Sequence, residues 1–164
     1  MTDHPHILRP GDQPVSKAGL DQVEIGLLAV FRHFIASFAA PDQQAWTTAL
    51  RLACDLWGPK DGAPVAVALL EVTDAMRRAR RSMFHFSNPN CPCCRGALTA
   101  NERHVITLIH AIRRGRLTDA RTQAMLLCEG HDTTEVLHTA TVLAALLPVP
   151  QTAAGVGFGV VPVE

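Results

Sequence analysis

Apolar residues recur every three or four positions along most of this chain, and that spacing constrains it to an all-α fold. Side chains three or four positions apart lie on one face of an α-helix. The stripe at 19–40 is formed by Leu20, Val23, Leu27, Val30, Phe31, Phe34 and Phe38. Similar stripes predict helices at about 42–57, 64–83, 99–115, 118–130 and 133–147. We therefore expect an all-α single domain of about six helices.

Residues that start or stop helices mark several of these boundaries. Pro41 and Asp42 suit a helical first turn, because proline needs no amide partner there and an acid complements the positive helix end. The glycines and proline of residues 58–62 predict a break before the third helix. Thr99 and Glu102 have capping-box spacing, which predicts the start of the fourth helix.

The ends of the chain differ in composition from its middle. Residues 1–18 are polar and contain three prolines, which predicts a flexible N-terminal arm. The helical domain with its thiol site is expected at 19–148, followed by a Pro-, Gly- and Val-rich C-terminal tail at 149–164. A hydrophobic content of 48% over 164 residues is enough for one domain with a core.

Targeting signals do not stand out in the sequence. The N-terminal residues lack the basic start and apolar run of a signal peptide. The best apolar stretch, Leu27 to Ala40, is interrupted by Arg32 and His33, so no span reaches the roughly 18 apolar residues of a membrane helix. We expect a cytoplasmic protein without membrane contact. Thirteen arginines against two lysines, with abundant Ala and Leu, are typical of a GC-rich bacterium.

Thiols are gathered in two places. Cys91, Cys93 and Cys94 lie in an irregular loop before the fourth helix, and Cys128 precedes His131 at the end of the fifth. Zinc takes four Cys or His ligands in tetrahedral geometry. Cys91 with Cys94, and Cys128 with His131, each have two intervening residues, which lets both members of a pair reach one ion. The sequence therefore predicts a structural zinc site formed by these four residues.

Other assignments of the same side chains stay open. Cys93 in place of His131 gives a four-thiolate site, and the four cysteines together fit an iron–sulfur cluster, which prefers thiolate ligands. His85 precedes the thiols closely enough to be an alternate ligand. The cysteines also fit a metal-free redox pair, or inert core positions such as the one expected for Cys54.

Charge is unevenly distributed, although the formal net charge is zero. Residues 1–76 carry five basic and nine acidic side chains, residues 77–121 carry ten and two, and residues 122–164 carry none and four. The basic middle either pairs with the acidic ends inside the fold or forms a surface for an acidic partner. The candidate partner-binding residues crowd the ends of the third and fourth helices: Arg77, Arg78, Arg80, Arg81, Arg113, Arg114 and Arg116.

These patterns favour a binding role over catalysis. The helix expected at 133–147 has no Lys, Arg, Asn or Gln to read base edges, and no phosphate-binding glycine loop precedes a helix. We expect a small bacterial regulatory or adaptor protein with a structural zinc, whose basic surface binds a protein or, alternatively, nucleic acid. Exposed apolar helix faces would also suit a homodimer.

Two further functional hypotheses use the same thiols. The first is an iron–sulfur or thiol-based redox sensor, in which oxidation releases the cysteine loop. The second is a metal-dependent enzyme with Glu129 as a general base beside the ion. The sequence shows neither a pocket nor an open coordination position, so it favours a protein without enzymatic activity.

Overall fold

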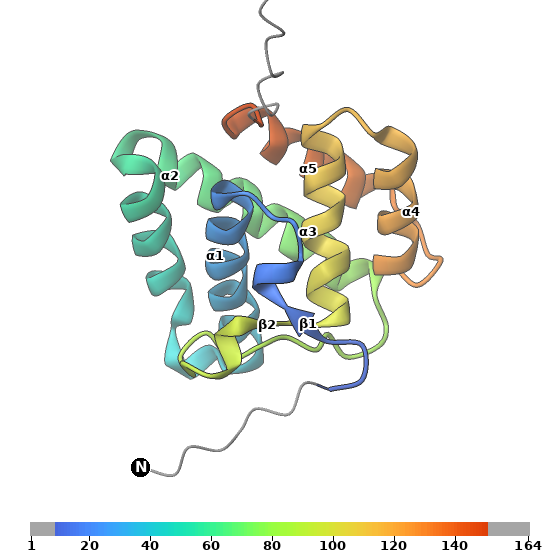
Figure 1. The fold of residues 1–164 in the computed structure, drawn as a ribbon. Helices are drawn as coiled ribbons and strands as arrows, with labels where there is room; N and C mark the ends of the chain where they lie inside the picture. Colours follow the sequence, from blue (N-terminus) through green and yellow to red (C-terminus); the bar gives the residue numbers. More distant parts are fainter. Residues whose placement is uncertain (1–8, 151–164) are drawn as a thin grey trace, which may run out of the picture.

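The computed structural model describes residues 9–150, and five α-helices account for most of them (Figure 1). The helices are α1 (Gln22–Ala39), α2 (Ala45–Ala79), α3 (Ala100–Arg113), α4 (Leu117–Leu127) and α5 (Thr134–Leu146). Three 3-10 turns span Val15–Lys17, Pro41–Gln43 and Cys94–Gly96. The prediction of an all-α single domain is confirmed. Residues 1–8 of the expected arm and 151–164 of the expected tail lie outside the described residues.

The helix count is five because α2 unites the second and third predicted helices. Gly58 has non-helical backbone angles (φ 80°, ψ 163°), and the helix resumes directly after it with Pro59. Proline suits the first turn of a helix, so the break is one residue long where the sequence predicted five. The two halves pack closely, since a Cβ on Gly62 would come within 2.4 Å of the carbonyl oxygen of Ala53.

Capping boxes define the starts of α1 and α3. The Thr99 side chain accepts the Glu102 amide, and the Glu102 side chain accepts the Thr99 amide, as the sequence predicted. Asp21 and Glu24 form the same pair of hydrogen bonds at α1. That second capping box carries the same spacing signal, which the sequence prediction did not use.

The core lies where α1 packs against both halves of α2, with α3 beside them (Figure 1). α4 packs on α3, and α5 packs on α2. Phe31 and Phe34 are buried as their stripe predicted, and the Phe31 ring meets Phe84 edge to face at 5.6 Å. Phe38 and Trp46 are exposed, so the apolar stripes extend past the part of each helix that the core covers.

A short pair of two-residue strands ties the N-terminal segment to the bundle. β1 (Gln13–Pro14) pairs antiparallel with β2 (Ala97–Leu98), with Gln13 opposite Leu98. Residues 9–18, expected to belong to a flexible arm, therefore hold a defined conformation against the strand that follows the cysteines.

α1 is long and apolar enough to cross a membrane by length and composition alone, with 18 residues and a mean hydropathy of 1.3. Half of it is buried inside the fold, and its charged residues Glu24 and Arg32 are buried in ion pairs. The sequence predicted no segment long and apolar enough to span a membrane, but α1 does meet that test of length and hydropathy. A helix buried in the core of a folded domain also meets it, so the test alone does not identify a membrane span.

Candidate metal centre

The thiol loop, which we define as residues 84–98, crosses the base of the bundle between α2 and α3 (Figure 1). Its first residues pack beside the end of α1, where Phe86, Asn88 and Asn90 line a shallow cavity with Ala36 and Ala39. Its last residues form the Cys94–Gly96 turn and β2. The cysteines occupy the middle of the loop.

A buried ion pair holds the two ends of the thiol loop. Arg32 of α1 and Glu102 of α3 lie 2.7 Å apart, with 4% and 0% of their side chains exposed. The Arg32 guanidinium also donates to the carbonyl oxygens of Arg95 and Ala97. The Glu102 carboxylate accepts the amide of Ser87 at 3.0 Å. Both sides of the cysteines are therefore anchored to the same pair of helices.

Further hydrogen bonds tie the loop to the start of α3. The His85 amide donates to Asn101 Oδ1 at 2.9 Å, and Thr99 Oγ1 donates to the His85 carbonyl at 2.8 Å. Ser87 Oγ donates to the carbonyl of Ala97 across the loop at 2.9 Å. The loop thus closes on itself at its base, and the segment that carries the cysteines projects from a rigid support.

Three thiols converge in this segment. The sulfur atoms of Cys91, Cys93 and Cys94 all lie within 4.8 Å of one another. Cys91 Sγ and Cys93 Sγ are 2.9 Å apart, and the Cys94 amide donates to Cys91 Sγ at 3.4 Å. Cys93 is exposed, whereas Cys91 and Cys94 are half-buried. This group can hold a metal ion.

The spacing of the sulfurs suits a thiolate metal site after a small adjustment. Zn–S bonds of about 2.3 Å in tetrahedral geometry put sulfur atoms about 3.8 Å apart. Cys91 and Cys93 would have to separate by about 1 Å to share such an ion, which side-chain rotation on an exposed turn can supply. Three thiolates leave one position of a tetrahedral ion for a fourth ligand.

Contacts among the thiols shift the pKa values of Cys91 and Cys94 in opposite directions. Hydrogen bonds from the Cys93 and Cys94 thiols lower the pKa of Cys91 to about 7, because they stabilise its thiolate. The hydrogen bond to Cys91, together with burial, raises the pKa of Cys94 to about 12. With a pKa of about 7, Cys91 is the thiol that ionises near neutral pH, and Cys94 needs a nearby cation to stabilise its thiolate.

The structure does not bring Cys128 or His131 into this group. Among residues 9–150, no other Cys, His, Asp or Glu places a ligand atom within 4.8 Å of all three thiols. Cys128 is fully buried in the hydrophobic core at the end of α4, and this burial raises the pKa of its thiol. His131 Nδ1 lies 2.9 Å from the Cys128 carbonyl. Cys128 and His131 therefore lie at the C-terminal end of α4 and are bonded to each other through the Cys128 carbonyl. The structure does not bring the four predicted ligands Cys91, Cys94, Cys128 and His131 together.

The alternate candidates also fall outside the group. His85 is exposed near the start of the loop, where its backbone amide and carbonyl anchor the chain. Cys54 is half-buried on α2. Glu129, considered as a general base beside a metal, accepts hydrogen bonds from the amides of Arg81 and Ser82 instead. Cys93 was named only as an alternate ligand, yet it is the third member of the thiol group.

The seven candidate arginines lie in two groups at opposite ends of α1. Arg77 stacks on Phe38 near the end of α1, whereas Arg113 and Arg114 contact Glu24 in its first turn. Fourteen residues of helix separate Phe38 from Glu24, which is about 20 Å. The two groups do not form one continuous surface.

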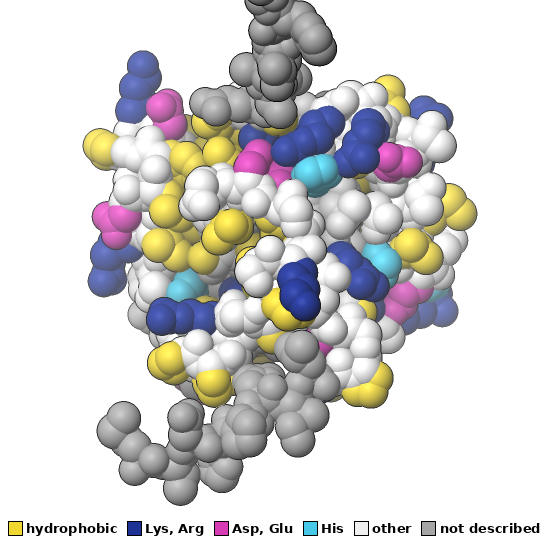
Figure 2. All heavy atoms as spheres, in the orientation of Figure 1, with side chains coloured by type: hydrophobic (Ala, Val, Ile, Leu, Met, Phe, Trp, Pro, Cys, Tyr) yellow, Lys and Arg dark blue, Asp and Glu magenta, His cyan; other side chains and the backbone are white. Residues whose placement is uncertain are grey.

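Most of these arginines are paired with acids from the ends of the chain. Arg113 and Arg114 contact Glu24, and Arg80 contacts Glu129 at 3.1 Å. Arg78 contacts Glu135 at 2.6 Å, whereas Arg116 lies 3.5 Å from Asp119, an acid of the basic middle itself. Figure 2 shows basic side chains in separate groups with acidic ones beside several of them. The basic middle of the sequence thus pairs largely with the acidic ends.

The arginines at the start of α1 surround a buried carboxylate. Glu24 is fully buried, and it contacts His110, Arg113 and Arg114 at 2.6–3.0 Å. Burial alone would raise the pKa of Glu24, but hydrogen bonds from His110, the Asp21 amide and Arg114 outweigh it and lower the pKa. This network joins α1 to α3 and has a structural role.

Comparison with known proteins gives no match to a protein-family model, to a curated protein sequence or to a solved structure. The thiol loop is therefore the feature on which a functional proposal has to rest.

Proposed function

We propose that this chain is a small regulatory metalloprotein in which Cys91, Cys93 and Cys94 bind a zinc ion. The observation that carries this proposal is the convergence of three sulfur atoms within 4.8 Å on an exposed, anchored turn. Thiolate ligands select soft or borderline metals, and zinc is the commonest of these in structural sites. A four-cysteine iron–sulfur cluster would need Cys128 as well, which is buried in the core.

The proposed regulation works through the thiol loop. The Cys94 amide already points at Cys91 Sγ, so zinc binding would order a turn whose two ends are fixed by Arg32 and Glu102. The fourth zinc ligand would be water or a side chain of a protein partner docked on the loop. In this proposal the partner contacts the thiol loop and the exposed arginines Arg77 and Arg78 in the last turn of α2.

The proposal includes a cytoplasmic location and a protein partner. All five cysteines are free thiols, and free thiols persist in reducing compartments. Nucleic acid is a weaker alternative, because most of the arginines are neutralised by neighbouring acids.

Zinc stoichiometry measured on untagged protein tests this function. We expect one zinc per chain, retained in Cys54→Ser and strongly reduced in Cys91→Ser, Cys93→Ser and Cys94→Ser. Cys54→Ser is the matched control, because it removes a thiol outside the group. Retention of the metal by Cys93→Ser, or its loss from Cys54→Ser, would contradict the assignment.

A thiol-based redox sensor is the second candidate, favoured by the 2.9 Å separation of Cys91 Sγ and Cys93 Sγ. A hydroperoxide would accept two electrons and both thiol protons, giving water and an alcohol while an S–S bond forms between the two cysteines. Mass spectrometry of metal-free protein after hydroperoxide treatment distinguishes the two. Loss of two hydrogen atoms, confined to the peptide with Cys91 and Cys93, favours the sensor.

A further inference from the structure

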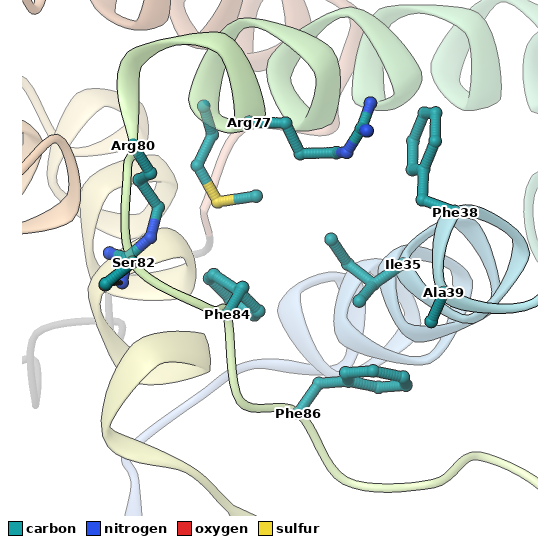
Figure 3. A pocket seen from close by; sticks show the side chains of 9 residues that line it. Ile35, Phe38, Ala39, Arg77, Arg80, Ser82, Phe84 and Phe86 are labelled. Carbon is teal, nitrogen blue, oxygen red and sulfur yellow. Dashed lines mark hydrogen bonds between the residues drawn. The ribbon is translucent and has the colours of Figure 1, made fainter.

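A cavity of about 250 Å³ lies between the end of α1, the last turns of α2 and the first residues of the thiol loop (Figure 3). Three phenylalanines contribute to its walls, with Phe38 from α1 and Phe84 and Phe86 from the loop. Arg77 in the last turn of α2 and Arg80 directly after the helix line it as well. The cavity therefore combines aromatic walls with cationic side chains.

Arg80 forms a fixed wall at one end of this cavity. Only 6% of its side chain is exposed, and its two terminal nitrogens donate to the Leu127 carbonyl at 2.7 Å and to Ser82 Oγ at 2.9 Å, while Glu129 pairs with the guanidinium at 3.1 Å. Its Nε is buried and has no hydrogen-bond partner among residues 9–150. Because Nε has almost no accessible surface and the rest of the guanidinium is already bonded, Arg80 shapes the cavity wall and does not supply the hydrogen bond to a ligand.

Arg77 has donors that are free to turn toward a ligand. Its guanidinium lies 3.7 Å from the centre of the Phe38 ring. Its contact with Asp74 is long, at 3.4 Å, and both side chains are more than 40% exposed, so this pair contributes little stability.

We propose that this cavity binds a small carboxylate with an aromatic body. The ring packs among Phe38, Phe84 and Phe86, and the carboxylate accepts hydrogen bonds from Arg77. The cavity is slightly smaller than the roughly 300–1,000 Å³ of typical drug-sized sites, which restricts the ligand to about one ring. This site is separate from the metal centre and does not depend on zinc.

Three probe molecules distinguish the contribution of the aromatic ring to binding from that of the carboxylate charge. We would titrate 3-phenylpropionate, its uncharged amide 3-phenylpropionamide, and propionate, and follow backbone amide resonances. The expected dissociation constant for 3-phenylpropionate is about 1 mM or tighter, with shifts at Phe38, Phe84 and Phe86. The amide and propionate should each bind at least about tenfold more weakly, because each lacks one half of the recognition.

Arg77→Gln and Arg78→Gln form a matched pair of variants. Both change an exposed arginine in the last turn of α2, but only Arg77 lines the cavity. Arg77→Gln should weaken 3-phenylpropionate binding about tenfold, and Arg78→Gln should leave it unchanged.

A triple variant with Cys91, Cys93 and Cys94 changed to serine tests whether the cavity binds its ligand independently of the metal centre. It should bind 3-phenylpropionate as the wild type does, whether or not zinc binding is lost. Equal binding of the acid and the amide, unchanged binding in Arg77→Gln, or shifts located away from Phe38, Phe84 and Phe86 would each overturn the proposal.

Discussion

Arg32 and Glu102, which are 70 positions apart in sequence, form a buried ion pair at 2.7 Å that anchors the thiol loop. The same guanidinium holds the carbonyls of Arg95 and Ala97, and the same carboxylate accepts the amides of Ser87 and Thr99. The contacts on either side of Cys91, Cys93 and Cys94 therefore depend on one pair of side chains in the core.

Glu102→Gln should be strongly destabilising. The carboxylate accepts four N–H groups, two from Arg32 and one each from Ser87 and Thr99, whereas a glutamine has one acceptor oxygen. Removing one partner of a buried pair costs about 3–5 kcal/mol. Urea unfolding measures this loss. Arg78→Gln is the control, because its exposed pair with Glu135 is worth at most about 1 kcal/mol. Similar losses in the two variants would contradict the anchoring role.

Gly62→Ala should force the two halves of α2 apart. A Cβ at this position would lie 2.4 Å from the Ala53 carbonyl oxygen and 2.5 Å from the Cys54 Cα, and backbone atoms cannot rotate away. The expected loss of stability is about 1–3 kcal/mol or more, measured by thermal or urea unfolding. Gly96→Ala, where a Cβ meets nothing within 4 Å, should change stability by less than about 1 kcal/mol. An unchanged Gly62→Ala protein would mean that the halves pack differently.

Acid should weaken the fold partly through Glu129. Hydrogen bonds from the Ser82 side chain and from the Arg81 and Ser82 amides lower the pKa of Glu129 from 4.5 to about 2. A lowered pKa in the folded state stabilises the fold above the unfolded value of 4.5, and this contribution is lost as the pH falls toward about 2.

The variant Glu129→Gln isolates that part of the acid sensitivity. Between pH 4.5 and about pH 2 its free energy of unfolding should fall less steeply than that of the wild type. Asp21 and Glu24, whose pKa values are also lowered, keep some acid sensitivity in both proteins. Urea unfolding over this pH range compares the two, and parallel curves would show that Glu129 gains nothing from these contacts.

Zinc should stabilise the protein through the three loop thiols. A ligand that binds only the folded state adds about 2.7 kcal/mol at a free concentration one hundred times its dissociation constant. Unfolding measured with zinc and with a chelator should show this difference in the wild type and in Cys54→Ser. Cys93→Ser should show little of it. A zinc effect of equal size in all three proteins would point to another site.

Local signals predicted much of the helical framework. The Thr99–Glu102 capping box starts α3, and the apolar spacing through Leu69, Val72 and Met76 identifies the buried face of the second half of α2. These features depend on residues within a few positions of one another, so the local sequence pattern is enough to predict them. The length of the break at Gly58 was overestimated, because Pro59 could equally end a helix or begin one.

The long-range contacts were beyond the reach of spacing arguments. The pairing of Arg32 with Glu102 depends on how α1 and α3 meet, and nothing local marks these residues as partners. Cys128 and His131 have the spacing of metal ligands, but Cys128 lies on the buried face of α4, where apolar neighbours surround it. Burial of that face, which Ala120, Ala124 and Leu127 share, decides the position of the thiol.

X-ray absorption at the zinc edge of the zinc-loaded protein tests the metal centre most directly, because it counts the sulfur atoms bound to the ion. We expect three sulfur neighbours at about 2.3 Å and one lighter oxygen or nitrogen neighbour. Cys128→Ser should give the same spectrum, and Cys93→Ser should lose a sulfur neighbour. A shell of four sulfurs that falls to three in Cys128→Ser, or a shell without sulfur, would contradict the assignment of Cys91, Cys93 and Cys94 as the ligands.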